Sequence, residues 1–112
     1  EGADAAARSF AAGRLIPRPE PVDTMADGIA VKSPSPRTWE YIRHYADAVV
    51  TVADPFIAEA ILLLLSRTKN LVEPSGAASL AALLQHPHLA HGKTVCVLCG
   101  GNLDLRLLSD LI

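Results

Sequence analysis

Apolar residues recur at helical spacing in several parts of the chain, and proline or glycine separates these parts. The alanine-rich segment 3–12 predicts a short helix, with Gly13 as its C-terminal stop. Three prolines between residues 14 and 22 exclude regular structure there, so we expect an extended linker. The first 22 residues are thus predicted to form one helix, followed by a connection that wraps around other elements.

Capping signals and apolar periodicity predict four further helices. Ser35 or Thr38 is expected to cap a helix that ends near Tyr45. Asp54 is expected to be the N-cap of the longest helix, with Pro55 in its first turn. The segments predicted to be helical are 35–45, 55–68, 77–85 and, at the end of the chain, 104–112.

Two β-branched runs, 48–52 and 93–99, predict strands. The second run ends in Cys99, two glycines and Asn102, so it would deliver polar groups at the carboxyl end of a strand, where α/β sheets bind ligands. Glycines allow close approach of the backbone, so Cys99 and Asn102 could reach a flat ligand. The alternative is a plain strand with a Gly-Gly turn and a buried cysteine. Together with the helices, the strands predict an α/β fold.

The predicted helix 55–68 carries apolar residues on more than one face. A helix of this kind is buried on both sides, which 112 residues with two strands can scarcely achieve alone. The chain also begins with Glu1 and not methionine, so we expect it to be part of a longer protein.

Composition narrows the classes of function. Half of the residues are hydrophobic and 4% are aromatic, so the core is expected to consist of Ala, Val, Leu and Ile. A net charge of −2 with scattered basic residues argues against nucleic-acid binding. The apolar run 61–65 is far shorter than the ~20 residues that span a bilayer, and no signal peptide is visible. We therefore expect a soluble, cytoplasmic protein without a membrane partner.

Several cysteines and histidines invite a metal or redox interpretation. Cys96 and Cys99 have redox-motif spacing, but on a strand they would lie ~10 Å apart on opposite faces, whereas a disulfide needs α-carbons within ~7 Å. The cluster of His86, His88 and His91 surrounds a proline in a polar connection, which is typical of a solvated loop. We predict neither a disulfide nor a zinc site.

Two acidic positions have both a structural and a functional interpretation. Asp27 beside Gly28 is most often a simple turn. Glu73 precedes a predicted helix, where its charge complements the helix dipole and Ser75 can cap. The same helix end would also favour a polarised ligand, so both interpretations of Glu73 remain open.

Three stretches carry a family resemblance: 24–30 with Ala-Asp-Gly, 72–78 with Glu-Pro-Ser-Gly, and 97–104 with Cys-Gly-Gly-Asn. They resemble the second half of the pyridoxal-phosphate-dependent threonine and serine ammonia-lyases, and serine racemases are similar through the same stretches. The resemblance covers essentially the whole chain, from Glu-Gly-Ala-Asp at residues 1–4 onwards. It implies part of a tryptophan-synthase-β-like (PLP fold type II) three-layer sandwich, with residues 1–112 as the carboxyl-terminal portion of the catalytic region.

The resemblance also implies a cofactor-binding wall and an incomplete active site. Cys99 matches the family's serine or cysteine opposite the pyridine nitrogen, Gly28 matches the loop beside the cofactor, and Glu73 matches a glutamate near the ring. Gly100 and Asn102 join them as expected cofactor-binding residues. The Schiff-base lysine and the phosphate-binding glycine loop are not in this chain, so we expect no catalytic residue here.

The implied activity is elimination of the β-hydroxyl of L-threonine or L-serine, giving 2-oxobutanoate or pyruvate and ammonia, with pyridoxal 5'-phosphate as cofactor. The expected partners are the amino-acid substrate, the amino-terminal half of the same enzyme and further copies in a homo-oligomer. Ala5 stands where related enzymes have a metal-binding aspartate, so we predict no metal site.

Several alternatives stay open. The parent could be a racemase of the serine racemase type, or the chain could be a non-catalytic module for oligomerisation or partner binding. Substrate preference, a regulatory domain and a biosynthetic role, as in isoleucine biosynthesis, or a degradative one are not decided by the sequence.

Overall fold

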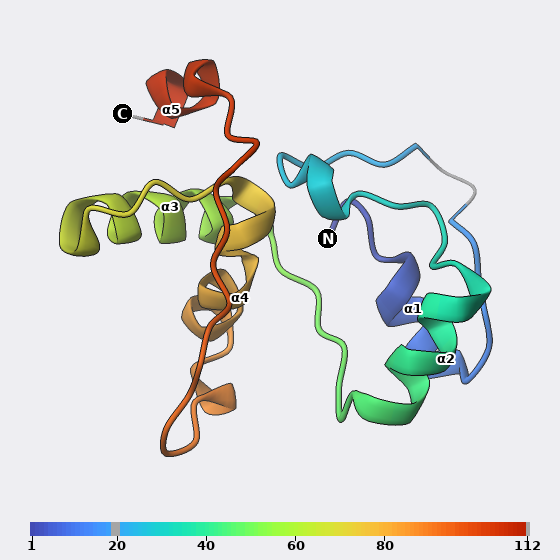
Figure 1. Cartoon of the computed structure of the whole chain (residues 1–112). Helices are drawn as coiled ribbons and strands as arrows, with labels where there is room; N and C mark the ends of the chain where they lie inside the picture. The colour runs from blue at the N-terminus through green and yellow to red at the C-terminus, as the bar shows by residue number, and fades with distance from the viewer. Residues whose placement is uncertain (19–20, 112) are drawn as a thin grey trace. The chain divides into compact units, whose positions relative to one another are not determined.

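The computed structural model describes residues 1–18 and 21–111, which form two compact units. The first comprises Glu1–Thr24 and Ile29–Thr51, and the second comprises Met25–Gly28 and Val52–Ile112. In chain order the helical elements are α1 (Ala5–Ala12), the 3₁₀ turn η1 (Asp27–Ile29), α2 (Pro36–Tyr45), α3 (Asp54–Thr68), α4 (Pro74–Gln85), the 3₁₀ turn η2 (Pro87–Leu89) and α5 (Leu105–Leu111) (Figure 1).

The first unit confirms both helix-terminus predictions that fall within it. Gly13 closes α1 in the left-handed conformation with φ 66°, and its N–H donates to the Phe10 carbonyl. Ser35 is the N-cap of α2, where its hydroxyl accepts the Thr38 N–H at 3.1 Å. These signals are local in the sequence, which is why they can be read without a structure.

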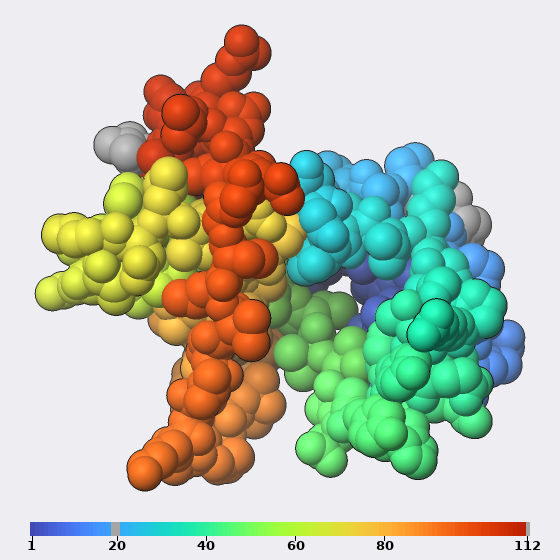
Figure 2. Space-filling view, viewed as in Figure 1, coloured from blue at the N-terminus to red at the C-terminus, as the bar shows by residue number. Residues whose placement is uncertain are grey.

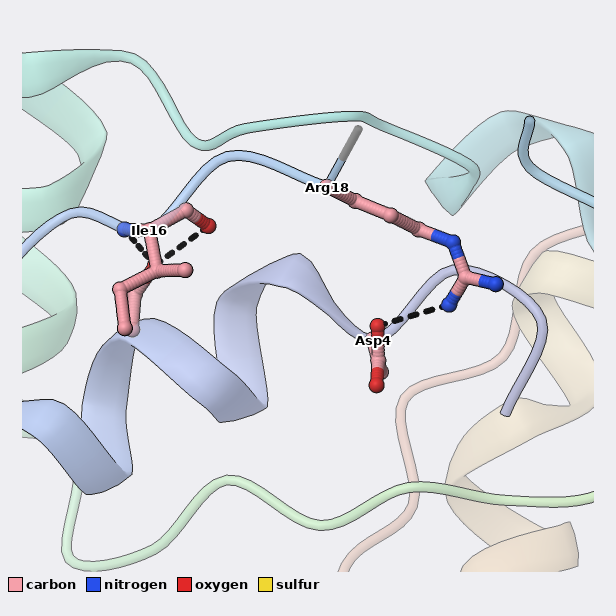
Figure 3. A network of polar contacts seen from close by, with 4 residues as sticks. Asp4, Ile16 and Arg18 are labelled. Atoms are coloured by element: carbon pink, nitrogen blue, oxygen red, sulfur yellow. Dashed lines mark hydrogen bonds and ion pairs between the residues drawn. The ribbon is translucent and has the colours of Figure 1, made fainter. Parts of the chain in front are cut away.

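Polar contacts fasten the predicted linker to α1 (Figure 3). The Arg18 guanidinium forms an ion pair with the Asp4 carboxylate at 2.8 Å. Ser9, which is fully buried on α1, accepts the Ile16 N–H at 2.9 Å. Residues 14–18 therefore follow the helix as a wrapping connection, as expected. Residues 19–20 of the predicted linker lie outside the described residues.

The second unit is organised by the packing of α3 against α4. Their facing surfaces are built from small and branched apolar side chains, which lets the two helices approach closely. The core residues are Ala26, Ile57, Ala60, Ile61, Leu64, Val72, Ala77 and Ala81. The leucines on the other faces of α3 are only partly buried: Leu62, Leu63 and Leu65.

The capping residues of α3 and α4 differ from the prediction. The N-cap of α3 is Ala53, one residue before the expected Asp54, whose carboxylate instead accepts the Met25 N–H at 2.7 Å. Helix α4 begins at Pro74, three residues earlier than expected, so Ser75 lies inside the helix and is not its cap. Proline is well suited to a first helical turn because its missing N–H would have no partner there.

The two predicted strands are not found, and the described residues form helices and connections only. A strand requires repeated hydrogen bonds to a neighbour ~4.8 Å away. Segment 93–99 has one backbone link of this kind, from the Glu73 N–H to the Cys99 carbonyl at 3.0 Å. The β-branched composition is present, but no described segment completes a ladder with it. The described residues taken alone therefore show the helices of the α/β prediction and not its strands.

Segment 92–104 crosses the surface of the second unit as an extended connection, the orange-to-red band of Figure 2. Its apolar side chains are largely in solvent, with Val95 87% exposed and Val97 78% exposed. None of the described helices is both long enough and apolar enough to cross a membrane.

Candidate functional site

The Glu73 carboxylate is the centre of a polar cluster at the N-terminus of α4. Glu73 is the N-cap residue of this helix in extended conformation, and its side chain caps no helical N–H. One carboxylate oxygen instead accepts the Asn102 N–H at 2.8 Å, and the other accepts the Cys99 thiol with a sulfur-to-oxygen distance of 3.5 Å. Three of the five predicted site residues therefore lie together, with Glu73 26 residues before Cys99 in the sequence.

The cluster raises the pKa of its thiol. The hydrogen bond to Glu73 raises the pKa of Cys99, and desolvation and the negative charge of Glu73 raise it further. A thiolate beside the carboxylate would lose the hydrogen bond and meet a like charge. Cys99 is exposed and is not in a disulfide, so at neutral pH it presents a neutral thiol to its surroundings.

The segment that carries Cys99 lies unusually close to α4 and to the residues before it. A Cβ on Gly100 would collide with the Leu71 carbonyl oxygen, and a Cβ on Gly76 would lie 2.6 Å from the Cys99 backbone nitrogen. The Ser79 hydroxyl donates to the Val97 carbonyl at 2.8 Å. Gly100, a predicted site residue, is thus required by close backbone packing.

Gly76 and Ser79 were not predicted as site residues. Only Gly76 has a signal in the sequence, and it is weak. A glycine inside an alanine-rich helix destabilises the helix by roughly 1 kcal/mol relative to alanine, so it usually has a packing reason. In α4 a side chain at position 76 would collide with the backbone of Cys99, so only glycine fits there.

Gly28 lies in η1, beside the first turn of α4. A Cβ on Gly28 would be 2.8 Å from the Ser75 hydroxyl oxygen. That oxygen is buried and has no hydrogen-bond partner among the described residues. Gly28 is thus brought to the same end of α4 as Glu73, although no direct contact links it to the thiol.

The histidines do not form a metal cluster. The rings of His86 and His88 meet edge to face with centroids 5.8 Å apart, while His91 is exposed. Across residues 1–18 and 21–111, no three His, Cys, Asp or Glu side chains are grouped so that they could hold a metal ion. Cys96 is a partly buried free thiol.

A family model described as "Pyridoxal-phosphate dependent enzyme" matches residues 1–100. The chain belongs to this family. It is 49% identical over 105 residues to an L-threonine ammonia-lyase of Geobacter sulfurreducens, covering 93% of the chain and 26% of that protein. It is 40% identical over 116 residues to a serine racemase of Arabidopsis thaliana, covering 98% of the chain and 34% of that protein. The chain thus spans about a quarter to a third of these curated relatives.

Solved structures of related enzymes have a similar fold. The fold matches a threonine deaminase of T.th. with a TM-score of 0.87 and 41% identity, over 93% of this chain and 38% of that one. It matches maize serine racemase with a TM-score of 0.81 and 34% identity, over 98% of this chain and 35% of that one. The family resemblance is confirmed, and the residues described here have the fold of one portion of these enzymes.

The described residues fit the family's cofactor in two respects. Cys99 is an accessible, neutral hydrogen-bonding group, the kind that suits an uncharged ring nitrogen. The unpartnered Ser75 hydroxyl next to Gly28 is a second polar group at the same helix end that a ligand could satisfy. The Glu73 carboxylate accepts the backbone N–H of Asn102, so these two residues shape the wall around the thiol.

Proposed function

We propose that the full-length protein is a pyridoxal-phosphate-dependent ammonia-lyase that removes the β-hydroxyl of L-threonine or L-serine to give a 2-oxo acid and ammonia. The observation that carries the proposal is the contact between Glu73 and Cys99. The family resemblance implies that both residues lie near the cofactor ring, and the two side chains are hydrogen-bonded in this chain. The similarity to L-threonine ammonia-lyase supports the choice of reaction.

In this proposal the chain contributes one wall of the site. The bound cofactor supplies an electron-withdrawing ring that makes the α-proton of an amino acid acidic. Cys99 would turn its S–H from Glu73 to the ring nitrogen, where a neutral thiol moderates this electron withdrawal compared with a carboxylate at the same place. Glu73 raises the pKa of that thiol and fixes the turn at Asn102 by accepting its backbone N–H.

The test is turnover by the full-length gene product that contains these residues. Purified protein with bound cofactor is incubated with L-threonine and with L-serine, and 2-oxo acid and ammonia are measured. We expect both products in equal amounts from at least one substrate. A cofactor-loaded protein that forms no 2-oxo acid from either amino acid would contradict the proposal.

The second candidate is amino-acid racemisation, which is favoured by the 40% identity to serine racemase. The same incubations distinguish it when the enantiomers of serine are separated by chiral chromatography. D-serine that accumulates faster than pyruvate would identify a racemase. Trace D-serine beside rapid release of pyruvate would leave the ammonia-lyase as the main activity.

The proposal also covers the rest of the active site, the oligomeric state and the location of the protein. The remainder of the site, including the lysine and the phosphate loop, is proposed to come from an amino-terminal half of the same protein in a cytoplasmic homo-oligomer and to complete the three-layer sandwich. A non-catalytic binding module is the opposing possibility, and absence of cofactor binding by the full-length protein would favour it.

A further inference from the structure

One face of α4 is built to receive the segment that carries Cys99. Gly76 and Ser79 are three residues apart, so they lie on the same side of the helix. Both meet segment 97–99, Gly76 through the backbone of Cys99 and Ser79 through the carbonyl of Val97. The Glu73 N–H adds a third link to the Cys99 carbonyl, at 3.0 Å.

Gly76 sets how close the segment can come. A side chain there would collide with the carbonyl oxygen of Cys99 and would lie 2.6 Å from its nitrogen. Real β-carbons essentially never come within 3.0 Å of another heavy atom, and here the obstacle is backbone that cannot rotate aside. Any larger residue at position 76 must therefore push Cys99 away from α4.

Ser79 sets where the segment lies along the helix. Its hydroxyl donates to the Val97 carbonyl at 2.8 Å, two residues before the thiol. The N–H groups of residues 94–98 form no backbone hydrogen bond with any other described segment. This side-chain contact is therefore a principal restraint on the approach to Cys99.

We infer that Gly76 and Ser79 are positioning residues that hold the Cys99 thiol against the Glu73 carboxylate. The inference rests on the proposed function for its link to the cofactor ring. The contact between Cys99 and Glu73 itself can be measured without cofactor. The two residues touch backbone and not the reacting atoms, so they act through Cys99.

The experiment follows the alkylation of Cys99 by iodoacetamide over a range of pH in the cofactor-free full-length protein, with the Cys99 peptide quantified by mass spectrometry. Only the thiolate reacts, so the midpoint of the profile reports the pKa of the thiol. We expect Ser79→Ala and Gly76→Ala to lower this midpoint, because Cys99 leaves Glu73. Alkylation near pH 8 should then rise about threefold for each half unit of pKa.

Matched variants separate positioning from general damage. Ser79→Thr keeps the hydroxyl and should restore the wild-type midpoint. Ser66→Ala removes another helical hydroxyl, bonded only within its own helix to Leu63, and should leave the midpoint unchanged. Gly101→Ala adds a methyl group to the same segment where no atom lies within 4 Å, and it should also leave the midpoint unchanged.

Two outcomes would overturn the inference: a wild-type midpoint in Ser79→Ala and Gly76→Ala, or a lowered midpoint in Ser79→Thr. If Gly76→Ala does not fold, the comparison of Ser79→Ala with Ser79→Thr decides alone. The absorbance of bound cofactor in the same variants tests the proposed function separately. Midpoints that move without any change in absorbance would support positioning and would contradict contact between Cys99 and the ring.

Discussion

The pKa of the Cys99 thiol is raised mainly by one neighbour, Glu73. Glu73 accepts its hydrogen bond and also carries a negative charge, and both effects favour the protonated thiol. The same carboxylate holds the backbone of Asn102. One side chain therefore both raises the pKa of the thiol and fixes the turn that follows it.

Replacing this carboxylate by an amide tests the electrostatic part of the argument. In Glu73→Gln the pKa of Cys99 should fall towards its ordinary value, because an amide has no negative charge and is a weaker acceptor. The raised pKa keeps the thiol neutral to higher pH, so the variant should react with iodoacetamide at lower pH than the wild type. Coincident profiles for the two proteins would show that Glu73 does not control the thiol.

Substitution of Cys99 itself tests its proposed place at the cofactor ring. Cys99→Ser should keep most of the elimination activity of the full-length protein, since a hydroxyl forms the same neutral hydrogen bond. Cys99→Asp should lower kcat about tenfold or more, because a carboxylate changes the electron withdrawal of the ring and lies beside Glu73. The readouts are 2-oxo acid formation and cofactor absorbance. If Cys99→Asp had the wild-type rate of 2-oxo acid formation and the wild-type cofactor absorbance, Cys99 would not contact the ring.

The grouping of Glu73 with Cys99 in one site could be predicted from the sequence only through the family pattern. Glu73 and Cys99 are 26 residues apart, and no local rule links a helix N-cap with a thiol in an extended segment. Gly76 escaped prediction because its role lies in the backbone of a residue that is distant in sequence. Contacts of this kind depend on tertiary packing, which a single sequence does not reveal directly.

At the scale of elements, the helices could be predicted and the strands could not. Helix signals are local: Ser35 caps α2, and Gly13 ends α1 with φ 66°. A strand depends on a partner, and segments 48–52 and 93–99 have the right composition without a ladder among the described residues. Helix α4 starts three residues before its predicted start, because Pro74 occupies the first helical turn and Ser75, the expected cap, lies inside the helix.

Gly13 offers a test of one local signal. Nothing lies within 4 Å of a Cβ at this position, so Gly13→Ala creates no clash and costs only the left-handed conformation. We expect it to lower the free energy of unfolding by about 1 kcal/mol, and Gly13→Asn to cost less, because asparagine tolerates this conformation better. Urea unfolding of the full-length protein, followed by helical circular dichroism, measures both. An alanine variant as stable as the wild type would show that α1 ends differently.

At the scale of the whole molecule, the 112-residue chain should not catalyse the reaction alone. Lys32, Lys69 and Lys93 are its lysines, and none lies in the family's setting for the covalent link to the cofactor. Without that link the covalent step has no protein partner. Incubation of the chain with pyridoxal 5'-phosphate and L-threonine should give no more 2-oxo acid than free cofactor does. Turnover above that control would mean that one of these lysines forms the covalent link to the cofactor.

The apolar surface of the chain predicts its behaviour in solution. Val95 and Val97 are 87% and 78% exposed, and Leu62, Leu63 and Leu65 line an open groove of about 620 Å³ along α3. Each large apolar side chain left in water forgoes roughly 1.5 to 3 kcal/mol relative to burial. A few such exposures rival the ~5 to 15 kcal/mol that stabilises a whole domain.

We therefore expect the isolated chain to self-associate or to remain loosely packed, with sedimentation coefficients that rise with concentration and a broad thermal transition. Val95→Thr with Val97→Thr should weaken the association, because threonine keeps the β-branched shape while its hydroxyl is compatible with water. Ser109→Ala, on an exposed position of α5, is the matched surface control and should change neither measurement. A chain that stays monomeric at every concentration and melts sharply would show that these residues close their own core, and it would favour an independent binding module over one portion of an enzyme.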